Sequence, residues 1–152
     1  MSNEVNATKA NEAPTRLADG TYQPVLTVSD LDRCGRRWML GASIYNYESQ
    51  CAPAVMFATE PALRKIYAGD EEGYRRSLLS TYRYYNATPQ VSGLLLGAGL
   101  ALEDKGHNDA IDAVQDLKIG LMGSLSGVGD TIFAILIPTI FGSIAAYMAI
   151  EG

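Results

Sequence analysis

The chain has 152 residues, of which 47% are hydrophobic, and a formal net charge of -5 at pH 7. Acidic and basic residues are interleaved over residues 30–118 without a basic stripe that would neutralise phosphates, which excludes a nucleic-acid-binding protein. All twelve Lys and Arg residues lie at or before Lys118, and residues 119–152 carry only Asp130 and Glu151 as charged side chains. The chain therefore has a polar N-terminal part and an apolar C-terminal part.

Residues 1–25 contain no apolar run and include two early acidic residues, so they are not a secretory signal peptide. We expect them to form a disordered tail. Cys34 and Cys51 lack the CxxC spacing and have no histidine close by in the sequence. They are predicted to be small, reduced hydrophobic side chains, and we expect no metal and no cofactor.

The first helix is expected within residues 26–50, LTVSDLDRCGRRWMLGASIYNYESQ. Ser29 is predicted to cap it, with Asp32 at the third helical position as in a capping box. Helical spacing gives this segment one apolar face, made of Leu31, Cys34 and Trp38. Because Trp38 lies beside three arginines, the pattern favours a helix at a membrane interface, and an amphipathic helix on a soluble core is the alternative.

Two more helices are predicted before Pro89. The first begins after Thr59, with Pro61 in its first turn, and ends at Gly69. The second runs until Pro89 and carries, at spacings of three and four residues, a stripe of Tyr74, Leu78, Tyr82 and Tyr85. We expect this stripe to belong to the core, with contact to a sugar as the alternative.

Residues 91–102 are uncharged and mainly apolar, with Gly93 and Gly97 in the spacing that lets helices approach closely. This run is shorter than the about 20 residues that span a bilayer, so a buried or re-entrant helix is expected. His107, the only histidine, lies in the polar turn that follows and is expected to be solvated. The next helix is amphipathic, and its predicted inward face is formed by Ala110, Ile111, Val114 and Leu117.

Residues 131–150, TIFAILIPTIFGSIAAYMAI, are uncharged throughout. A helix of this length is about 30 Å long, which matches the hydrocarbon core of a bilayer and predicts a membrane segment. Pro138 and Gly142 predict either a kink or a hairpin that turns back. Because the basic residues all precede this segment, the positive-inside rule predicts that residues 1–118 are cytoplasmic.

The segment before it, GLMGSLSGVGD at residues 120–130, holds four glycines, each of which weakens a helix by about 1 kcal/mol relative to Ala. It lacks the lysine and hydroxyl ending of a phosphate-binding loop. Two compatible interpretations stay open: a face for close helix packing, and a helix break at membrane depth that lines a polar cavity. These structural glycines are Gly120, Gly123, Gly127 and Gly129. Asp130 is predicted either to cap the following helix or to lie on a transport path.

Five segments together resemble a known family. In chain order they read LTVSDL, ASIYNYESQ, PALRKIY, YYNATPQ and AIDAVQDLKIGLMGSLSGVGD. Their order and spacing resemble the IID component of the mannose/fructose/sorbose family of the bacterial phosphotransferase system. The glycine block ending in Gly-Asp is the most specific part, and the triplet Asn46, Tyr47 and Glu48 is second. The resemblance covers the N-terminal half of such a component, which continues through further membrane segments.

This resemblance implies a membrane subunit of a sugar transporter in the bacterial cell membrane. It would translocate a hexose with a IIC partner, in a higher oligomer, while separate IIA and IIB subunits phosphorylate the sugar through histidines. No catalytic residue is expected in the IID component itself. At subunit contacts or near the sugar path we predict the polar residues Asn46, Glu48, Asn86 and Asp130. The structural alternatives are that Asn86 caps a turn and that Glu48 pairs with an arginine.

The sequence thus predicts an all-α integral membrane protein with amphipathic or interfacial N-terminal helices. Its expected parts are a disordered tail (1–25), a helical cytoplasmic or interfacial region (26–118), and a Gly-rich re-entrant break with a C-terminal membrane segment or hairpin (119–152). Two other functions stay open. One is a single-span, membrane-tethered helical adaptor that binds protein and transports nothing, and the other is a soluble helical domain with a buried hairpin.

Overall fold

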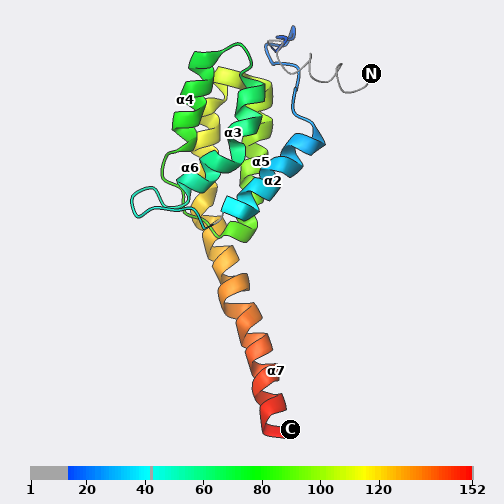
Figure 1. Ribbon diagram of the computed structural model, residues 1–152, viewed down its shortest axis with the longest axis vertical. Coiled ribbons are helices and arrows are strands. Elements are labelled where there is room, and N and C mark those ends of the chain that lie inside the picture. The colour runs from blue at the N-terminus through cyan, green and yellow to red at the C-terminus, as the bar shows by residue number, and fades with distance from the viewer. Residues whose placement is uncertain (1–13, 42, 152) are drawn as a thin grey trace.

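The computed structural model describes residues 14–41 and 43–151. In this part of the chain the regular structure is helical, and the only β-type pairs are isolated bridges. Figure 1 shows a bundle of helices at one end of the molecule and one long helix that projects from it toward the C-terminus. The predicted all-α class is confirmed.

The bundle contains α2 (Val28–Gly41), α3 (Ala52–Ile66), α4 (Glu71–Thr81), α5 (Pro89–Gly106), a short 3-10 turn η2 (His107–Asp109) and the first part of α6 (Ile111–Gly129). The long helix continues from α6 through η3 (Asp130–Leu136) into α7 (Ile137–Glu151). In the bundle, helices that follow each other in the chain pack together: α2 lies on α3, α3 on α4, and α5 on α6.

The first helix begins at Val28, and its capping box is formed by Thr27 and Asp30. Thr27 N donates to Asp30 Oδ2 at 2.8 Å, and Asp30 N donates to Thr27 Oγ1 at 3.4 Å. The same carboxylate accepts a hydrogen bond from Lys65 Nζ of α3 at 2.6 Å. The predicted cap at Ser29 is therefore wrong, because a long-range partner fixes Asp30 at the helix start.

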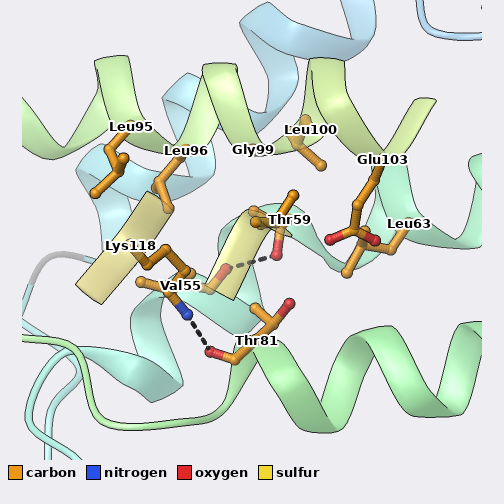
Figure 2. Close-up of a pocket in the computed structure, with 11 residues that line it drawn as sticks. Val55, Thr59, Leu63, Thr81, Leu95, Leu96, Gly99, Leu100, Glu103 and Lys118 are labelled. Atoms are coloured by element: carbon orange, nitrogen blue, oxygen red, sulfur yellow. Dashed lines mark hydrogen bonds between the residues drawn. The ribbon is translucent and has the colours of Figure 1, made fainter. Parts of the chain in front are cut away.

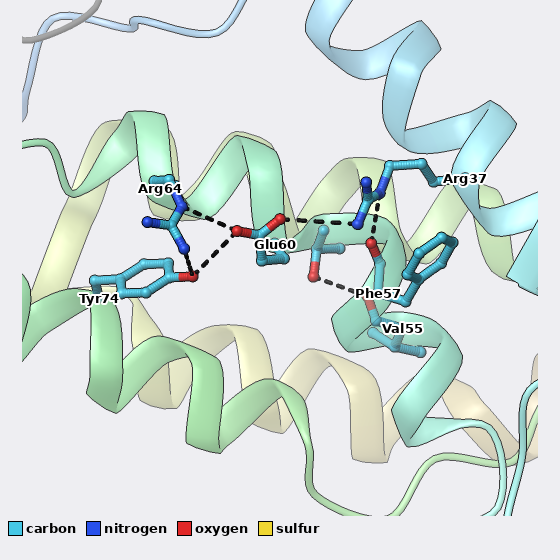
Figure 3. Close-up of polar contacts among 7 residues, drawn as sticks. Arg37, Val55, Phe57, Glu60, Arg64 and Tyr74 are labelled. Atoms are coloured by element: carbon cyan, nitrogen blue, oxygen red, sulfur yellow. Dashed lines mark hydrogen bonds and ion pairs between the residues drawn. The ribbon is translucent and has the colours of Figure 1, made fainter.

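The helix α3 runs unbroken from Ala52, so the prediction of a helix that begins after Thr59 is wrong. Pro61 lies inside it. Proline has no N–H, so the carbonyl four residues earlier, that of Phe57, loses its helical donor. Arg37 Nε from α2 donates to this oxygen at 2.7 Å (Figure 3). The helix passes its internal proline because a neighbouring helix satisfies the freed acceptor.

Glu60 joins three helices around that position, as Figure 3 shows. Its Oε1 lies 2.9 Å from Arg64 Nε and accepts a hydrogen bond from Tyr74 OH of α4 at 3.4 Å. Its Oε2 lies 3.8 Å from Arg37 Nη2 of α2. Because these groups are partly or largely exposed, the pairs add little stability, and the network mainly fixes how α2 and α4 sit on α3.

The core consists of two clusters along the bundle. One is built on α3 and the first half of α5 and contains Trp38, Ala52, Ala54, Val55, Ala58, Tyr85, Ala87, Leu95 and Leu96. The other contains Cys34, Ala62, Leu63, Ile66, Tyr67, Leu100 and Ile111. The predicted inward face of α6 is confirmed by the burial of Ala110, Ile111 and Val114 and the partial burial of Leu117.

Trp38 is a core residue and does not lie on an interfacial face. It is 3% exposed, and its indole Nε1 donates to Pro89 O at 2.9 Å. The interfacial interpretation of this tryptophan is wrong, because the start of α5 supplies both the cover and the acceptor that an indole N–H needs. The alternative, an amphipathic helix packed on a bundle, describes α2.

The aromatic stripe is only partly helical. Tyr74 and Leu78 pack against the second cluster, but α4 ends at Thr81. Tyr82 is exposed, whereas Tyr85 is buried in the connection to α5. The predicted helix up to Pro89 is therefore too long, and Tyr85 reaches the core from a loop.

His107 is 4% exposed, so the expectation of a solvated histidine is wrong. Its ring lies tilted against that of Tyr22, with 3.8 Å between ring centroids, and burial lowers its pKa below the ordinary value of 6.5. Residues 1–13 of the expected tail lie outside the described residues. Residues 14–25 pack on the end of α5, where Val25 N donates to Asp104 Oδ1 at 2.9 Å.

The long helix is continuous over Ile111–Glu151, 41 residues, and is the one helix of the described residues that is long and apolar enough to cross a membrane. Of the two predicted arrangements, the structure has the single segment and no hairpin. The glycine block is helical, and the departure from α-helical geometry begins after it, as the π-helical stretch η3. The structure therefore has no re-entrant break within the glycine block, because residues 120–129 belong to one continuous helix.

Candidate functional site at the exit end

The four polar residues predicted from the sequence lie at one end of the bundle, where α6 leaves it. We call this region the exit end, and it comprises the loop 43–50, the connection 82–88 and the helical stretch 122–130. Asn46 and Glu48 lie in the loop, Asn86 in the connection, and Asp130 at the start of η3. In Figure 1 the loop protrudes beside the point where the long helix leaves the bundle.

Asn46 organises the loop. Its Oδ1 accepts hydrogen bonds from Ser49 N at 2.7 Å and Ser49 Oγ at 3.0 Å. Its backbone exchanges two hydrogen bonds with Gln50, which adopts a φ of 54°. The Nδ2 group donates to Tyr82 OH at 3.3 Å. An asparagine suits this position because its amide accepts from the loop and donates across to the connection 82–88.

The loop and the connection are also joined through their backbones. Cys51 N donates to Tyr85 O at 2.8 Å, and Tyr85 N donates to Ser49 O at 3.3 Å. Asn86 N in turn donates to the sulfur of Met122 on α6 at 3.0 Å. Segments far apart in the sequence are therefore held against each other at the point where α6 leaves the bundle.

The side chains of Asn86 and Glu48 are exposed. Among the described residues the side chain of Asn86 makes no hydrogen bond that would cap a turn before Pro89, and Thr88 occupies the N-cap position of α5. In the part of the chain that the structure describes, Glu48 makes no ion pair with an arginine. Both side chains have free hydrogen-bonding groups at the exit end.

Asp130 is held by Thr88. Thr88 Oγ1 donates to Asp130 Oδ1 at 2.8 Å, and Ser126 Oγ lies 3.5 Å from Asp130 Oδ2. The preceding Gly129 is buried, and a Cβ built there would lie 2.4 Å from Thr88 Cβ. Glycine at this position thus allows the connection and the helix to touch, which places the carboxylate beside the threonine.

The other three glycines of the block have a different environment. A Cβ on Gly120, Gly123 or Gly127 would meet nothing within 4 Å outside the helix's own backbone. The close-packing face predicted for Gly120, Gly123 and Gly127 is therefore not used within the described chain, whereas Gly129 makes a close contact there. Nothing in the described chain covers Gly120, Gly123 and Gly127. Their contact with another helix therefore stays a prediction.

Sequence reasoning missed a buried polar group in the bundle interior. Glu103 and Lys118 are 4% and 5% exposed, and both line a cavity of about 20 Å³ with mainly aliphatic walls (Figure 2). Glu103 Oε2 accepts from Ser77 Oγ at 2.5 Å and Tyr67 OH at 3.0 Å, while Lys118 Nζ donates to Thr81 O at 3.2 Å. Burial raises the pKa of Glu103.

This interior cavity is of a size that holds about one water molecule, so it is not a sugar site. The sequence did not predict the burial of Glu103, because the charged run Glu103, Asp104 and Lys105 is typical of the exposed polar end of a helix. Among the described residues no group of three His, Cys, Asp or Glu side chains is placed to hold a metal ion. The amides, hydroxyls and carboxylate of the exit end suit hydrogen bonding to a hydroxyl-rich ligand or to another helix.

A family model described as the PTS system mannose/fructose/sorbose family IID component matches residues 25–152. The chain belongs to this family. The resemblance noted in the sequence is therefore confirmed, and the IID family assignment covers both the bundle and the long helix.

Relatives of this IID chain carry matching descriptions. It is 34% identical over 135 residues to the mannose-specific EIID component of Escherichia coli K12, covering 87% of this chain and 48% of that protein. It is 30% identical over 118 residues to the fructose permease IID component of Bacillus subtilis 168, covering 76% of this chain and 42% of that protein.

Solved structures show the same fold. A cryo-EM structure of the mannose transporter ManYZ in complex with microcin E492 matches with a TM-score of 0.75 and 32% identity, over 86% of this chain and 48% of the matched chain. The predicted class of all-α membrane protein is thus confirmed. The IID chain spans about half the length of the curated relatives it matches.

Proposed function

We propose that this chain is a non-catalytic membrane subunit of a sugar-transporting phosphotransferase system of the mannose/fructose/sorbose class. It helps a IIC membrane partner to translocate a hexose, in a higher oligomer, while IIA and IIB subunits phosphorylate the sugar. The observation that carries this proposal is the IID family match over residues 25–152, which includes a helix able to span a membrane.

The orientation follows from the charges. All Lys and Arg residues lie at or before Lys118, on the bundle side of the apolar segment, and cytoplasmic flanks are the positively charged ones. We therefore place the bundle in the cytoplasm and residues 131–150 in the bacterial cell membrane.

The exit end supplies the polar residues for this role. Asp130 keeps acceptor capacity on its carboxylate beyond the bond to Thr88, and the exposed amide of Asn86 can both donate and accept. Asn46 uses much of its hydrogen-bonding capacity to shape the loop that presents Glu48. We assign Asn46 to loop positioning, and Glu48, Asn86 and Asp130 to subunit contact or the sugar path.

One observation favours a second candidate function. The bundle has its own core of two clusters, and none of the residues of α7 is buried in the described chain. A tethered adaptor that binds protein without transport would have this organisation. It predicts that the chain supports no sugar uptake, whatever membrane partner is present.

Co-expression of the full chain with a IIC-like membrane protein tests the proposal. We expect a complex that survives detergent extraction and, with IIA and IIB added, hexose uptake into vesicles. Asp130→Asn is expected to weaken the complex or uptake, and Asp116→Asn, an exposed acid on the same helix, serves as the matched control. A stable detergent-free monomer, or a complex without uptake in all variants, would contradict transport and favour the soluble or adaptor alternatives.

A further inference from the structure

Large apolar and aromatic side chains gather in an exposed rim around the exit end. They come from the end of α2, the loop 43–50, the connection 82–88 and the second turn of α5. We define the rim by its members, Met39, Leu40, Ile44, Tyr45, Tyr47, Tyr82, Tyr84 and Leu94, all of them exposed. Tyr47 is 96% exposed although it is fixed within an ordered loop. Such a concentration of apolar surface marks an interaction site.

Charged residues are scarce in the segments that carry the rim. Over residues 38–50 the only charged side chain is Glu48, and over residues 82–102 it is Arg83. The segments at the opposite end of the bundle, around the starts of α4 and α6, instead contain Lys65, Asp70, Glu71, Glu72, Lys105, Asp109 and Asp112. The bundle therefore has a polar end and an apolar end along its axis.

The apolar end coincides with the point where the long helix leaves the bundle (Figure 1). The uncharged segment begins at Thr131, one residue after Asp130, which belongs to the exit end. A carboxylate at the bilayer centre costs about 2.5–3.5 kcal/mol, so Asp130 marks the edge of the hydrocarbon layer. The rim surrounds this edge, and tyrosines are enriched at that depth because their rings are apolar and their hydroxyls are hydrated.

We propose that the rim lies in the lipid headgroup layer, so that the bundle rests on the bilayer with its exit end against the membrane. This inference rests on the proposed function only for the membrane location of residues 131–150. The sequence had predicted an interfacial role for Trp38. The proposal instead assigns this role to the tyrosines of the loop 43–50 and the connection 82–88. The ligand is the lipid surface itself.

Tryptophan depth probes test this placement in the full chain reconstituted in lipid nanodiscs. Tyr47→Trp and Tyr45→Trp place probes on the rim, and Leu102→Trp places a matched exposed probe toward the far end of α5. Trp38 is buried and contributes the same background to each variant, which the parent chain measures. We expect lipids with spin-labelled headgroups to remove about half or more of the rim signal and to leave the Leu102→Trp signal unchanged.

Two further outcomes separate the possibilities. Quenching of the rim probes by aqueous iodide and not by lipid would overturn the proposal, as would protection from both quenchers, which indicates a protein partner over the rim. Phe141→Trp reports separately on the membrane segment through quenching by lipids brominated on their chains. If Phe141→Trp is quenched and the rim probes are not, the rim proposal fails while the membrane segment stands; if neither is quenched, the proposed membrane function fails too.

Discussion

The bundle and the projecting helix use the same kinds of side chain in opposite ways. In the bundle, Leu63 and Ile66 are buried, and charged residues cover the outside. In α7 the large apolar side chains face outward, and Ile150 is 85% exposed. The two regions therefore expose different surfaces, one with many charged groups on the bundle and one that is almost wholly apolar on α7.

Polar groups show the same difference. In the bundle they join one helix to another, as Arg37 does at the carbonyl of Phe57. In the projecting helix the hydroxyls of Thr131, Thr139 and Ser143 donate to carbonyls four residues earlier, at 2.7 to 2.8 Å. A helix that satisfies its own polar groups needs no water, which is the requirement for a segment in the hydrocarbon layer.

The largest expected effect is in the bundle core. Leu63→Ala should lower the free energy of unfolding of the bundle by about 2–5 kcal/mol, because it leaves a cavity between α3 and α5. Chemical denaturation in detergent, followed through the buried Trp38, measures this loss. Ile144→Ala in α7 should leave the same transition unchanged, and an equal loss in both variants would remove the distinction between the two regions.

A charge in the projecting helix should act on membrane insertion. Ile144→Lys is expected to cost about 2.5–3.5 kcal/mol of insertion free energy near the centre of the segment. The membrane-bound fraction after carbonate extraction should fall for this variant. Leu79→Lys, at an exposed apolar position of α4, should extract like the parent chain. Retention of Ile144→Lys in the membrane fraction would speak against lipid around α7.

The junction of the two regions should be sensitive to a single methyl group. Gly129→Ala places a Cβ against Thr88 and is expected to destabilise the exit end by about 1–3 kcal/mol. Gly123→Ala is the matched control, since a Cβ there meets nothing within 4 Å in the chain. The difference in unfolding midpoint between the two variants measures the effect, and equal midpoints would show that the contact with Thr88 does not restrict position 129.

The smallest expected effect is a pH dependence confined to the bundle. Burial holds the pKa of folded His107 below 6.5, although nearby Asp104 and Asp70 oppose this shift. As the pH falls through 6.5, the unfolded chain takes up a proton that the folded chain does not, so stability decreases toward the lower folded pKa. His107→Asn removes the titrating imidazole and should flatten the thermal unfolding midpoint between about pH 7 and about pH 5.

Much of the fold follows from local pattern. The membrane segment is predicted because hydropathy over residues 131–150 requires no knowledge of the rest of the chain. The extent of α3 does not follow, because Pro61 is tolerated only through Arg37, which lies in another helix. Trp38 and His107 were misplaced for the same reason, since Pro89 and Tyr22 reach them only in the folded chain.

The candidate residues could be named one by one from the sequence, but their common location at one end of the bundle could not. Asn46, Asn86 and Asp130 are separated in sequence by whole helices, and only the packing of two connections against α6 brings them to one end. Periodicity gives no information on that convergence. It also conceals Glu103, whose burial depends on the hydroxyls of Tyr67 and Ser77 from two other helices.

The helix Ile111–Glu151 runs without interruption from the bundle into the apolar segment, so the inclination of one part is passed to the other. Its bundle part, Ile111–Gly129, is about 28 Å long at 1.5 Å per residue. An inclination of about 20° of the lipid-embedded arm would then sweep the far end of the bundle sideways by about 10 Å. A change in bilayer thickness or in the contact with a neighbouring subunit would in this way move the far end of the bundle.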